Sequence, residues 1–192
     1  MLNLSNNNGS GNSYIRFAPQ ANAWTNRDGE EIQLKKVVMD LDSVQTGWLM
    51  IAAGMRDWQP DETLGAKSQS PGEGYKRGFQ VTLFSKELSL VDWSANSYGV
   101  CKGFEKIYNE CEKAAGDNAG KLPVIEYINS TPEKVGKGNT RVPNFKLAGW
   151  VARPAGMNAD GGDDFEPEPA PVRKAAKPAP APAPVMDDEE FF

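Results

Sequence analysis

The sequence contains no histidine and only two cysteines, Cys101 and Cys111. Without histidine, zinc sites of the usual kinds are excluded, and any general acid–base chemistry would depend on carboxylates. If residues 99–115 are helical, the two cysteines lie roughly 15 Å apart along the helix axis, which is too far for a disulfide. Both are therefore predicted to be small apolar packing residues, and no cofactor or metal is expected.

Long apolar runs are also absent. No stretch approaches the ~20 apolar residues that a membrane span needs, and no charged-then-apolar signal opens the chain. Residues 1–12 are polar and are expected to be flexible. The expectation is a soluble, intracellular protein without a membrane partner.

Charge is unevenly distributed along the 192 residues. Residues 154–192 hold nine acids and three bases, whereas residues 1–153 hold 17 acids and 18 bases. The acidic balance therefore belongs to the C-terminal part. A nearly neutral body of about 150 residues, carrying local basic loops, is compatible with a polyanionic ligand.

Residues 154–186 are mostly Ala, Pro, Gly and acids, a composition that predicts a disordered, semi-stiff linker. The linker leads to a tip of four carboxylates and two rings, Asp187, Asp188, Glu189, Glu190, Phe191 and Phe192. The tip predicts a partner-binding ligand whose acids enter a basic groove and whose last ring enters an apolar pocket. The alternative is a tail that only solubilises, but such a tail has no use for paired terminal rings.

Residues 13–153 show strand patterns on both sides of one helical pattern. The helix is predicted from the spacing of Val100, Phe104, Ile107 and Cys111, with Ser97 as its cap and Gly116 as its stop. Strands are predicted at residues 14–17, 30–41, 44–55, 79–85 (with 88–93 extending or following it), 124–128 and 144–152. Three main strands, one helix and two strands follow the order of a five-stranded OB-like barrel, which makes the predicted fold mainly β.

Departures from this regular pattern predict bends and loops. The apolar alternation of residues 30–41 slips by one at Lys35 and Lys36, which predicts a β-bulge in a single bent strand. Glycines and prolines in residues 56–74 predict a long loop. Residues 131–141 predict a flexible basic hairpin loop between the last two strands.

Aromatic and basic residues cluster in the loops and at strand ends. Single-stranded nucleic acid is bound by cations that follow the phosphates and by rings that stack on bases. This hypothesis assigns contacts to Arg56, Trp58, Tyr75, Lys76, Arg77, Trp93, Lys134, Lys137, Arg141, Lys146 and Trp150. Trp150 is included because strand alternation puts it with Lys146, on the face opposite Phe145 and Leu147. The alternative for each residue is ordinary surface charge or a core ring.

Signals for catalysis are weak. The segment Gly136-Lys137-Gly138 lacks the Ser or Thr that follows the lysine of a phosphate-binding P-loop. Asp40 and Asp42 share a strand face and could hold Mg²⁺ as in a nuclease, although aspartates beside a turn commonly serve the turn itself. The chain is therefore expected not to be an enzyme.

The layout as a whole resembles the single-stranded DNA-binding proteins of phages and bacteria. The tip from Asp187 to Phe192 is similar to that of the phage replication type, and it departs from the common bacterial tip, which has Ile-Pro before the last Phe. The segments 75–79 and 94–100 are similar to small prophage-encoded proteins of this kind.

The resemblance implies a non-catalytic protein that coats and protects single-stranded DNA during replication, recombination and repair in the cytoplasm of a bacterial host. It also implies that the tip recruits replication or recombination proteins such as a polymerase, a helicase-primase or a nuclease. Two alternatives stay open: an OB-like protein-interaction module with a solubilising tail, and a Mg²⁺-dependent nuclease. RNA as the ligand and the formation of a homo-oligomer are not decided by these residues.

Deletion of residues 187–192 is expected to tighten binding to single-stranded DNA at low salt. The reason is that an acidic tip competes with phosphates for the cationic loops, and this competition weakens with salt. Titration of labelled oligo-dT with the full and the truncated chain tests this. Unchanged or weaker affinity of the truncated chain contradicts it.

Overall fold

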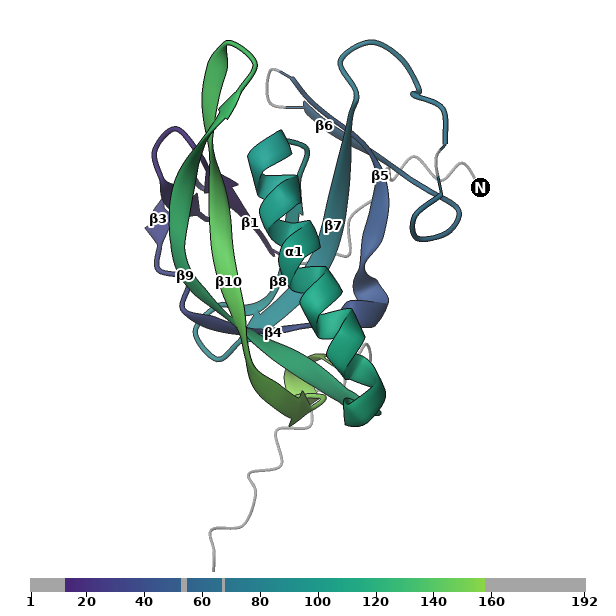
Figure 1. Ribbon diagram of the computed structural model, residues 1–192, viewed down its shortest axis with the longest axis vertical. Coiled ribbons are helices and arrows are strands. Elements are labelled where there is room, and N and C mark those ends of the chain that lie inside the picture. The colour runs from purple at the N-terminus through teal and green to yellow at the C-terminus, as the bar shows by residue number, and fades with distance from the viewer. Residues whose placement is uncertain (1–12, 53–54, 67, 158–192) are drawn as a thin grey trace, which may run out of the picture. The chain divides into compact units, whose positions relative to one another are not determined.

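Ten β-strands and one long α-helix make up the part of the chain that the computed structural model describes, residues 13–52, 55–66 and 68–157 (Figure 1). In chain order the elements are β1 (Ser13–Ala18), β2 (Ala23–Thr25), β3 (Glu31–Ile32), β4 (Lys36–Met39), β5 (Gln45–Ala52), β6 (Met55–Pro60), β7 (Lys76–Ser85), β8 (Ser89–Ala95), α1 (Tyr98–Ala115), β9 (Lys121–Val135) and β10 (Gly138–Ala152). The predicted mainly β fold is confirmed. The predicted flexible residues 1–12, residues 158–186 of the predicted linker and the tip lie outside the described ranges. Residues 154–157, predicted as the start of the disordered linker, are instead described, with a 3-10 turn at Ala155–Met157 and Met157 buried.

The strands form one mixed sheet in the order β10-β9-β4-β7-β8-β1-β2-β3, with β5 paired to β7 and β6 paired to β5. Neighbouring strands are antiparallel except β1 and β8, which run parallel. Among the described residues β10 and β3, the two ends of this order, are not paired, so the hydrogen-bonded sheet is open. None of the helices in these ranges has the length and apolar character needed to cross a membrane.

The single bent strand predicted for residues 30–41 is wrong. β3 ends at Ile32 and pairs with β2, whereas β4 begins at Lys36 and pairs with β7 and β9. The slip in the apolar alternation therefore marks a transfer of the chain between two parts of the sheet. The predicted β-bulge is replaced by a break between two short strands.

The strand predicted for residues 44–55 and the loop predicted for 56–74 are also corrected. β5 ends at Ala52, and β6 begins at Met55 and pairs antiparallel with β5 along its whole length. Trp58 stabilises this hairpin because it pairs with Leu49 on β5, and both side chains are buried. The glycines and prolines of the predicted loop begin to dominate only after β6.

The last two strands form a longer hairpin than the sequence predicted, since β9 and β10 have 15 residues each. Residues 131–141, which were predicted to be a flexible loop, are paired strand residues of this hairpin except for the turn at Gly136 and Lys137. Gly136 has a φ of 58°, and a two-residue hairpin turn requires this left-handed conformation. Two register shifts, at Asn144/Phe145 and Leu147/Gly149, interrupt the ladder.

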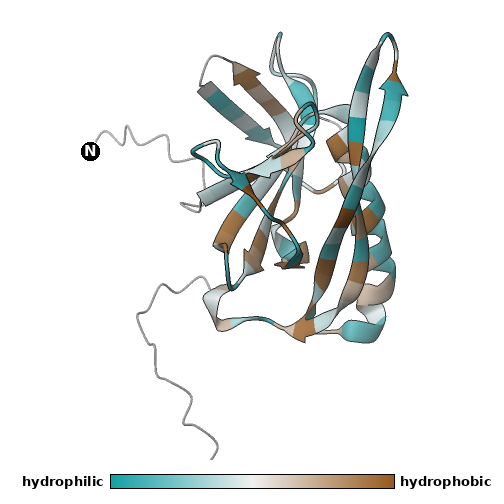
Figure 2. Cartoon of the chain, turned by 90° about the vertical axis from the view of Figure 1, so that its left-hand side faces the viewer, coloured by the Kyte–Doolittle hydropathy of each residue, from teal (hydrophilic) through white to brown (hydrophobic). Residues whose placement is uncertain are grey.

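A set of interlocked aromatic rings forms the centre of the core. Trp93 is fully buried, and its ring lies edge-on to Phe79 and Phe104, with centroids 4.9 and 5.5 Å away. Phe79 and Phe104 stack on each other at 3.8 Å, which joins the sheet to α1. Ring pairs contribute about 0.5–1.5 kcal/mol beyond their burial. Figure 2 shows hydrophobic and hydrophilic residues alternating along the strands, as burial of one sheet face requires.

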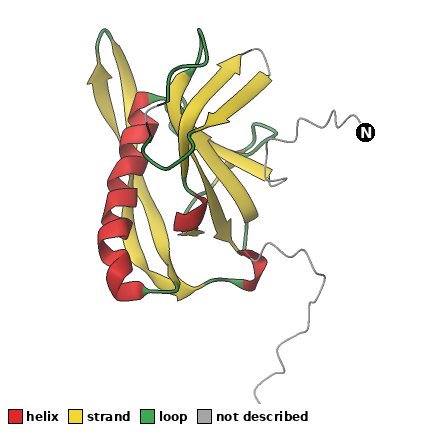
Figure 3. Ribbon diagram, turned by 90° about the vertical axis from the view of Figure 1, so that its right-hand side faces the viewer, coloured by secondary structure: helices red, strands yellow, loops and turns green. Residues whose placement is uncertain are grey.

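The predicted helix is confirmed, with Ser97 at the N-cap position of α1 and Gly116 at its C-cap. α1 lies alongside the β9–β10 hairpin (Figure 3) and presents Gly99 and Gly103 to β10. A methyl group on Gly103 would lie 2.4 Å from the carbonyl oxygen of Pro143. The missing side chains therefore allow the helix to approach the backbone of β10 directly.

Gly103→Ala is expected to lower the melting temperature by several degrees. Because the added methyl would meet a backbone oxygen, overpacking should cost toward the upper part of about 1–3 kcal/mol, which exceeds the ~1 kcal/mol by which alanine favours a helix over glycine. Gly116→Ala is the matched control, because nothing lies within 4 Å of a Cβ at that position, and it should leave stability unchanged or slightly raised. Thermal unfolding followed by circular dichroism measures both. A Gly103→Ala protein as stable as the wild type would contradict the close approach.

Candidate nucleic-acid interface

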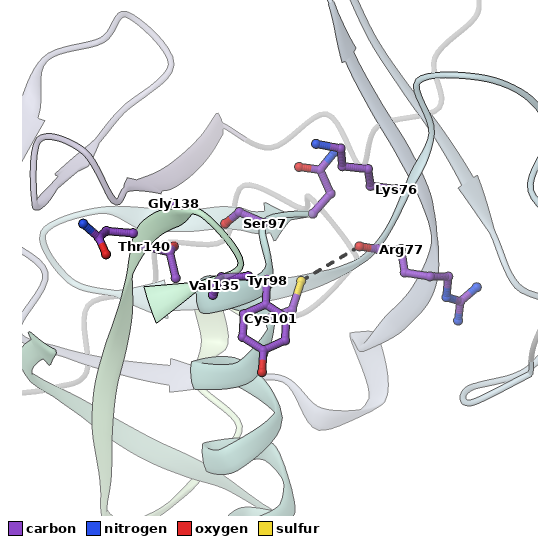
Figure 4. A pocket seen from close by; sticks show the side chains of 10 residues that line it. Lys76, Arg77, Ser97, Tyr98, Cys101, Val135, Gly138 and Thr140 are labelled. Carbon is purple, nitrogen blue, oxygen red and sulfur yellow. Dashed lines mark hydrogen bonds between the residues drawn. The ribbon is translucent and has the colours of Figure 1, made fainter. Parts of the chain in front are cut away.

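A groove of about 530 Å³ opens where β7 and α1 begin and the β9–β10 hairpin ends. We call it the hairpin groove, and its lining residues are Lys76, Arg77, Asn96, Ser97, Tyr98, Cys101, Val135, Gly138, Asn139 and Thr140. Of the residues predicted to bind nucleic acid, the structure brings Lys76 and Arg77 into this lining (Figure 4). The groove therefore combines apolar surface with amides, hydroxyls and cations.

Tyr98 is an aromatic residue of this groove that the sequence interpretation missed. It is the first residue of α1 and is 57% exposed. The ammonium group of Lys102 lies 5.9 Å from its ring centroid and is held there by Glu133, with Nζ–Oε1 at 2.7 Å. A signal was available, because Tyr98 stands outside the apolar stripe of the helix and therefore could not be a core ring.

The two predicted cations of the groove differ in how they are bonded. Arg77 donates two hydrogen bonds to the carboxylate of Asp61, at 2.8 and 2.6 Å, and its guanidinium lies 5.3 Å from the Trp48 ring centroid. Figure 4 shows its side chain extending away from Tyr98. Lys76 is exposed and forms no ion pair with any residue in the described ranges. Lys76 is thus the groove lysine that is free to meet a phosphate.

Asp61 holds the loop that follows β6. Its side chain is 1% exposed and also accepts hydrogen bonds from the hydroxyls of Thr46 and Ser68. The Arg77 guanidinium, above all, holds the pKa of this carboxyl well below its usual range. Asp61 in turn raises the pKa of Arg77. This pair therefore fixes the entry to β7 and with it one wall of the hairpin groove.

Arg56 and Tyr75 were also predicted to bind nucleic acid, but their side chains form hydrogen bonds with other side chains of the protein. Arg56 donates to the hydroxyl of Ser94 at 2.6 Å and to the amide oxygen of Gln80 at 3.3 Å, and burial lowers its pKa. Tyr75 donates its hydroxyl to the carboxylate of Asp57. Arg56 thus ties the β5–β6 hairpin to β7 and β8, and neither residue lines the hairpin groove.

The structure corrects the placement of the three predicted tryptophans. Trp58 is 6% exposed and Trp93 is fully buried, so neither ring presents a face on which a base could stack. Trp150 is half-buried and pairs with Pro123. The register shift between Leu147 and Gly149 turns it to the same face as Leu147, and the predicted alternation missed this shift.

The cations predicted on the last hairpin do not form one cluster. Lys134 and Lys137 are exposed near its tip, beside the hairpin groove. Arg141 donates from Nε to the hydroxyl of Ser130 at 2.7 Å, which bonds the two strands together. Lys146 lies farther down β10, where it forms an ion pair with Glu126 at 3.2 Å.

Asp40 of the candidate metal pair is bonded within the protein, and the two cysteines are partly or fully buried. Arg153 donates to both oxygens of Asp40, at 2.7 and 2.9 Å, and Asp40 also caps the 3-10 turn Leu41–Ser43. The described residues contain no group of three or more side chains that could hold a metal ion. Cys101 and Cys111 are free thiols, and burial raises their pKa values to about 11 and about 12.

Comparisons with protein-family models, with curated proteins and with solved structures find no match for this chain.

Acid should destabilise the protein in part through Asp61. Because its folded pKa lies below the ordinary value of about 3.9, its stabilising effect is complete above about pH 4 and is lost as the pH falls further. Asp61→Asn is expected to lower the free energy of unfolding at pH 7 by about 1–3 kcal/mol. Between pH 7 and pH 3, the free energy of unfolding of this variant should fall by less than that of the wild type.

Urea unfolding at both pH values checks this prediction. Asp117→Asn, at an exposed position after α1, is the matched control. If Asp61→Asn and Asp117→Asn respond to acid alike, the assignment of the acid-sensitive contribution to Asp61 is wrong.

Proposed function

We propose that this chain is a non-catalytic single-stranded DNA-binding protein that coats and protects unpaired DNA during replication, recombination or repair. The observation that carries the proposal is the hairpin groove, where the exposed Tyr98 ring lines the same apolar hollow as Lys76, an exposed lysine that has no ion-pair partner among the described residues. A ring that stacks on bases and cations that follow phosphates are the two elements of sequence-independent single-strand binding.

The strand order supports an OB-like arrangement of the body. With β4 and β5 taken as one interrupted first strand, β7, β8, α1, β9 and β10 follow in the OB order, and β4 pairs with β9 as first and fourth strands do. In this interpretation β1–β3 take the place where the third and fifth strands of a five-stranded barrel would meet. Contacts of Trp24 on β2 with Tyr127 and Phe145, at 5.7 and 6.1 Å between ring centroids, support it.

If the body is taken as OB-like, the position of the hairpin groove corresponds to the region with which OB folds bind oligonucleotides, between the connection of the first two strands and the loop that joins the last two. Lys134 and Lys137 at the tip of β9–β10 extend its positive charge. The acidic tip from Asp187 to Phe192 supports a second activity, recruitment of replication or recombination proteins.

Tyr98→Ala is expected to weaken binding to oligo-dT by about 5- to 150-fold, which corresponds to the loss of one stacked base at ~1–3 kcal/mol. Tyr98→Phe keeps the ring and should bind within about twofold of the wild type. Lys76→Gln should reduce the slope of log K against log salt by about 0.7, as for one lost phosphate contact on a single strand.

Fluorescence anisotropy of a labelled oligo-dT, measured with the full chain at two salt concentrations, gives these values. A duplex of equal length serves as the competitor and should compete poorly. The proposal fails if the wild-type protein does not bind the single strand at low salt. If Tyr98→Ala and the wild type bind with equal affinity, the bases do not stack on Tyr98.

A further inference from the structure

A second groove, of about 410 Å³, lies at the other end of β7, where this strand turns into β8. We call it the lysine groove, and its lining residues are Lys35, Lys36, Ser85, Lys86, Glu87, Glu126 and Tyr127. It contains none of the residues that the sequence interpretation assigned to nucleic acid. Three lysines against two carboxylates give it a net positive charge.

Two residues of the groove, Lys36 and Glu126, belong to a row of charges in register across three strands, and the third member of the row, Lys146, lies outside the groove lining. Lys36 on β4 pairs with Glu126 on β9, and Glu126 pairs with Lys146 on β10. The single carboxylate of Glu126 therefore serves two ammonium groups, at 3.7 and 3.2 Å. Because one negative charge cannot neutralise two lysines, the row keeps a net positive charge.

The other two lysines of the groove are not neutralised. Lys35 and Lys86 are both exposed, and neither forms an ion pair with a residue in the described ranges. Lys35 is positioned through its backbone, since its carbonyl accepts a hydrogen bond from the Tyr127 amide at 2.8 Å. The groove thus offers ammonium groups from two separate segments of the chain to an anion between them.

The two grooves lie at opposite ends of β7, which runs from Lys76 in the hairpin groove to Ser85 in the lysine groove. Both grooves also include residues of β9: Tyr127 of the lysine groove lies in the middle of this strand, and Val135 of the hairpin groove is its last residue. At a rise of ~3.3 Å per residue, this span of β7 is about 30 Å. A nucleic-acid strand stacked at ~3.4 Å per nucleotide would cover that length with about nine nucleotides.

We propose that the lysine groove is a second phosphate-binding site for the same single strand whose bases enter the hairpin groove. This inference rests on the proposed function. A strand held at both ends has a binding site of about nine or more nucleotides, and its affinity depends on its length. Phosphate is favoured as the ligand because the groove presents three ammonium groups, whereas the ring of Tyr127 is half-buried and packs against Trp24 and Phe145.

The test compares Lys35→Gln/Lys86→Gln with the charge-matched control Lys106→Gln/Lys113→Gln, whose lysines lie on the exposed side of α1. Each full-length protein is titrated with dT20 and with dT4. A dT4 strand falls short of about 30 Å even at twice the stacked rise of ~3.4 Å, so it cannot reach from one groove to the other. Thermal unfolding confirms that both double variants are folded.

Loss of two phosphate contacts should lower the salt slope for dT20 by about 1.4, and weaken dT20 binding about 60-fold at 50 mM and about 10-fold at 200 mM salt. Binding of dT4 to Lys35→Gln/Lys86→Gln should stay within about twofold of the wild type, and the control variant should match the wild type for both oligonucleotides.

The possible failures can be distinguished. If the wild-type protein binds neither oligonucleotide, the proposed function itself is wrong. If it binds dT20 and the two double variants behave alike, the second site is overturned. Equal weakening of dT4 and dT20 overturns the two-groove arrangement, because the lysine groove would then be the primary site. The two-groove arrangement is also overturned if Lys35→Gln/Lys86→Gln weakens only the binding of an acidic hexapeptide with the tip sequence. The lysine groove would then be a peptide-binding groove.

Discussion

The close approach of α1 to the backbone of β10 determines the shape and position of the hairpin groove, the candidate interface. At Gly99 the approach is limited by the carbonyl oxygen of Arg141, and at Gly103 by that of Pro143. Pro143 suits this position because it has no amide hydrogen that the helix would leave without an acceptor. Tyr98, directly before the first glycine, is thereby held beside Thr140, and the N-terminus of the helix becomes a wall of the hairpin groove. A helix standing farther from the hairpin would leave no narrow hollow for a ligand to enter.

Arginines and lysines have different roles in this molecule. Arg77 and Arg153 each form paired hydrogen bonds with a carboxylate, and Arg56 and Arg141 bond side chains of neighbouring strands. The planar guanidinium suits such fixed contacts, whereas the ammonium group of lysine is a mobile point charge. The cations that remain available to a polyanion are therefore mainly lysines at the ends of the strands. In residues 1–153 the 18 bases are balanced by 17 acids, and only the fold separates the cations that are engaged from those that are free.

The sequence was sufficient for those parts of the fold that depend on local pattern. The helix was predicted to within a residue because Val100, Phe104, Ile107 and Cys111 repeat at the spacing of one buried face, with a cap and a glycine at its ends. The hairpin between the last two strands also followed from alternation. Contacts between distant segments were not accessible in this way. Nothing near Trp58 indicated that it would pair with Leu49 and turn a predicted loop into β6.

The candidate site was predicted less well than the fold for a similar reason. A single extra residue at Ala148 reverses the face of Trp150, and a sequence pattern does not reveal on which strand a register shift falls. The burial of Trp93 depends on rings from β2, β7, α1 and β10 that converge from distant parts of the chain. Three of the predicted cations do lie at or beside the groove: Lys76, Lys134 and Lys137. Their exposure could be predicted because residues at a strand end or near a hairpin turn are exposed whatever the rest of the fold is.

The use of the tryptophans in the core has a consequence for recognition. Trp24, Trp58 and Trp93 are nearly or fully buried, so the groove surface offers Tyr98 as its exposed ring rather than a series of indoles. Under the proposed function, stacking then contributes one contact, and the remaining affinity comes from lysines that meet phosphates. Such a balance makes binding strongly dependent on salt and nearly independent of base sequence, because phosphates carry no sequence information. These are the properties that a protein needs in order to cover whatever single strand is exposed.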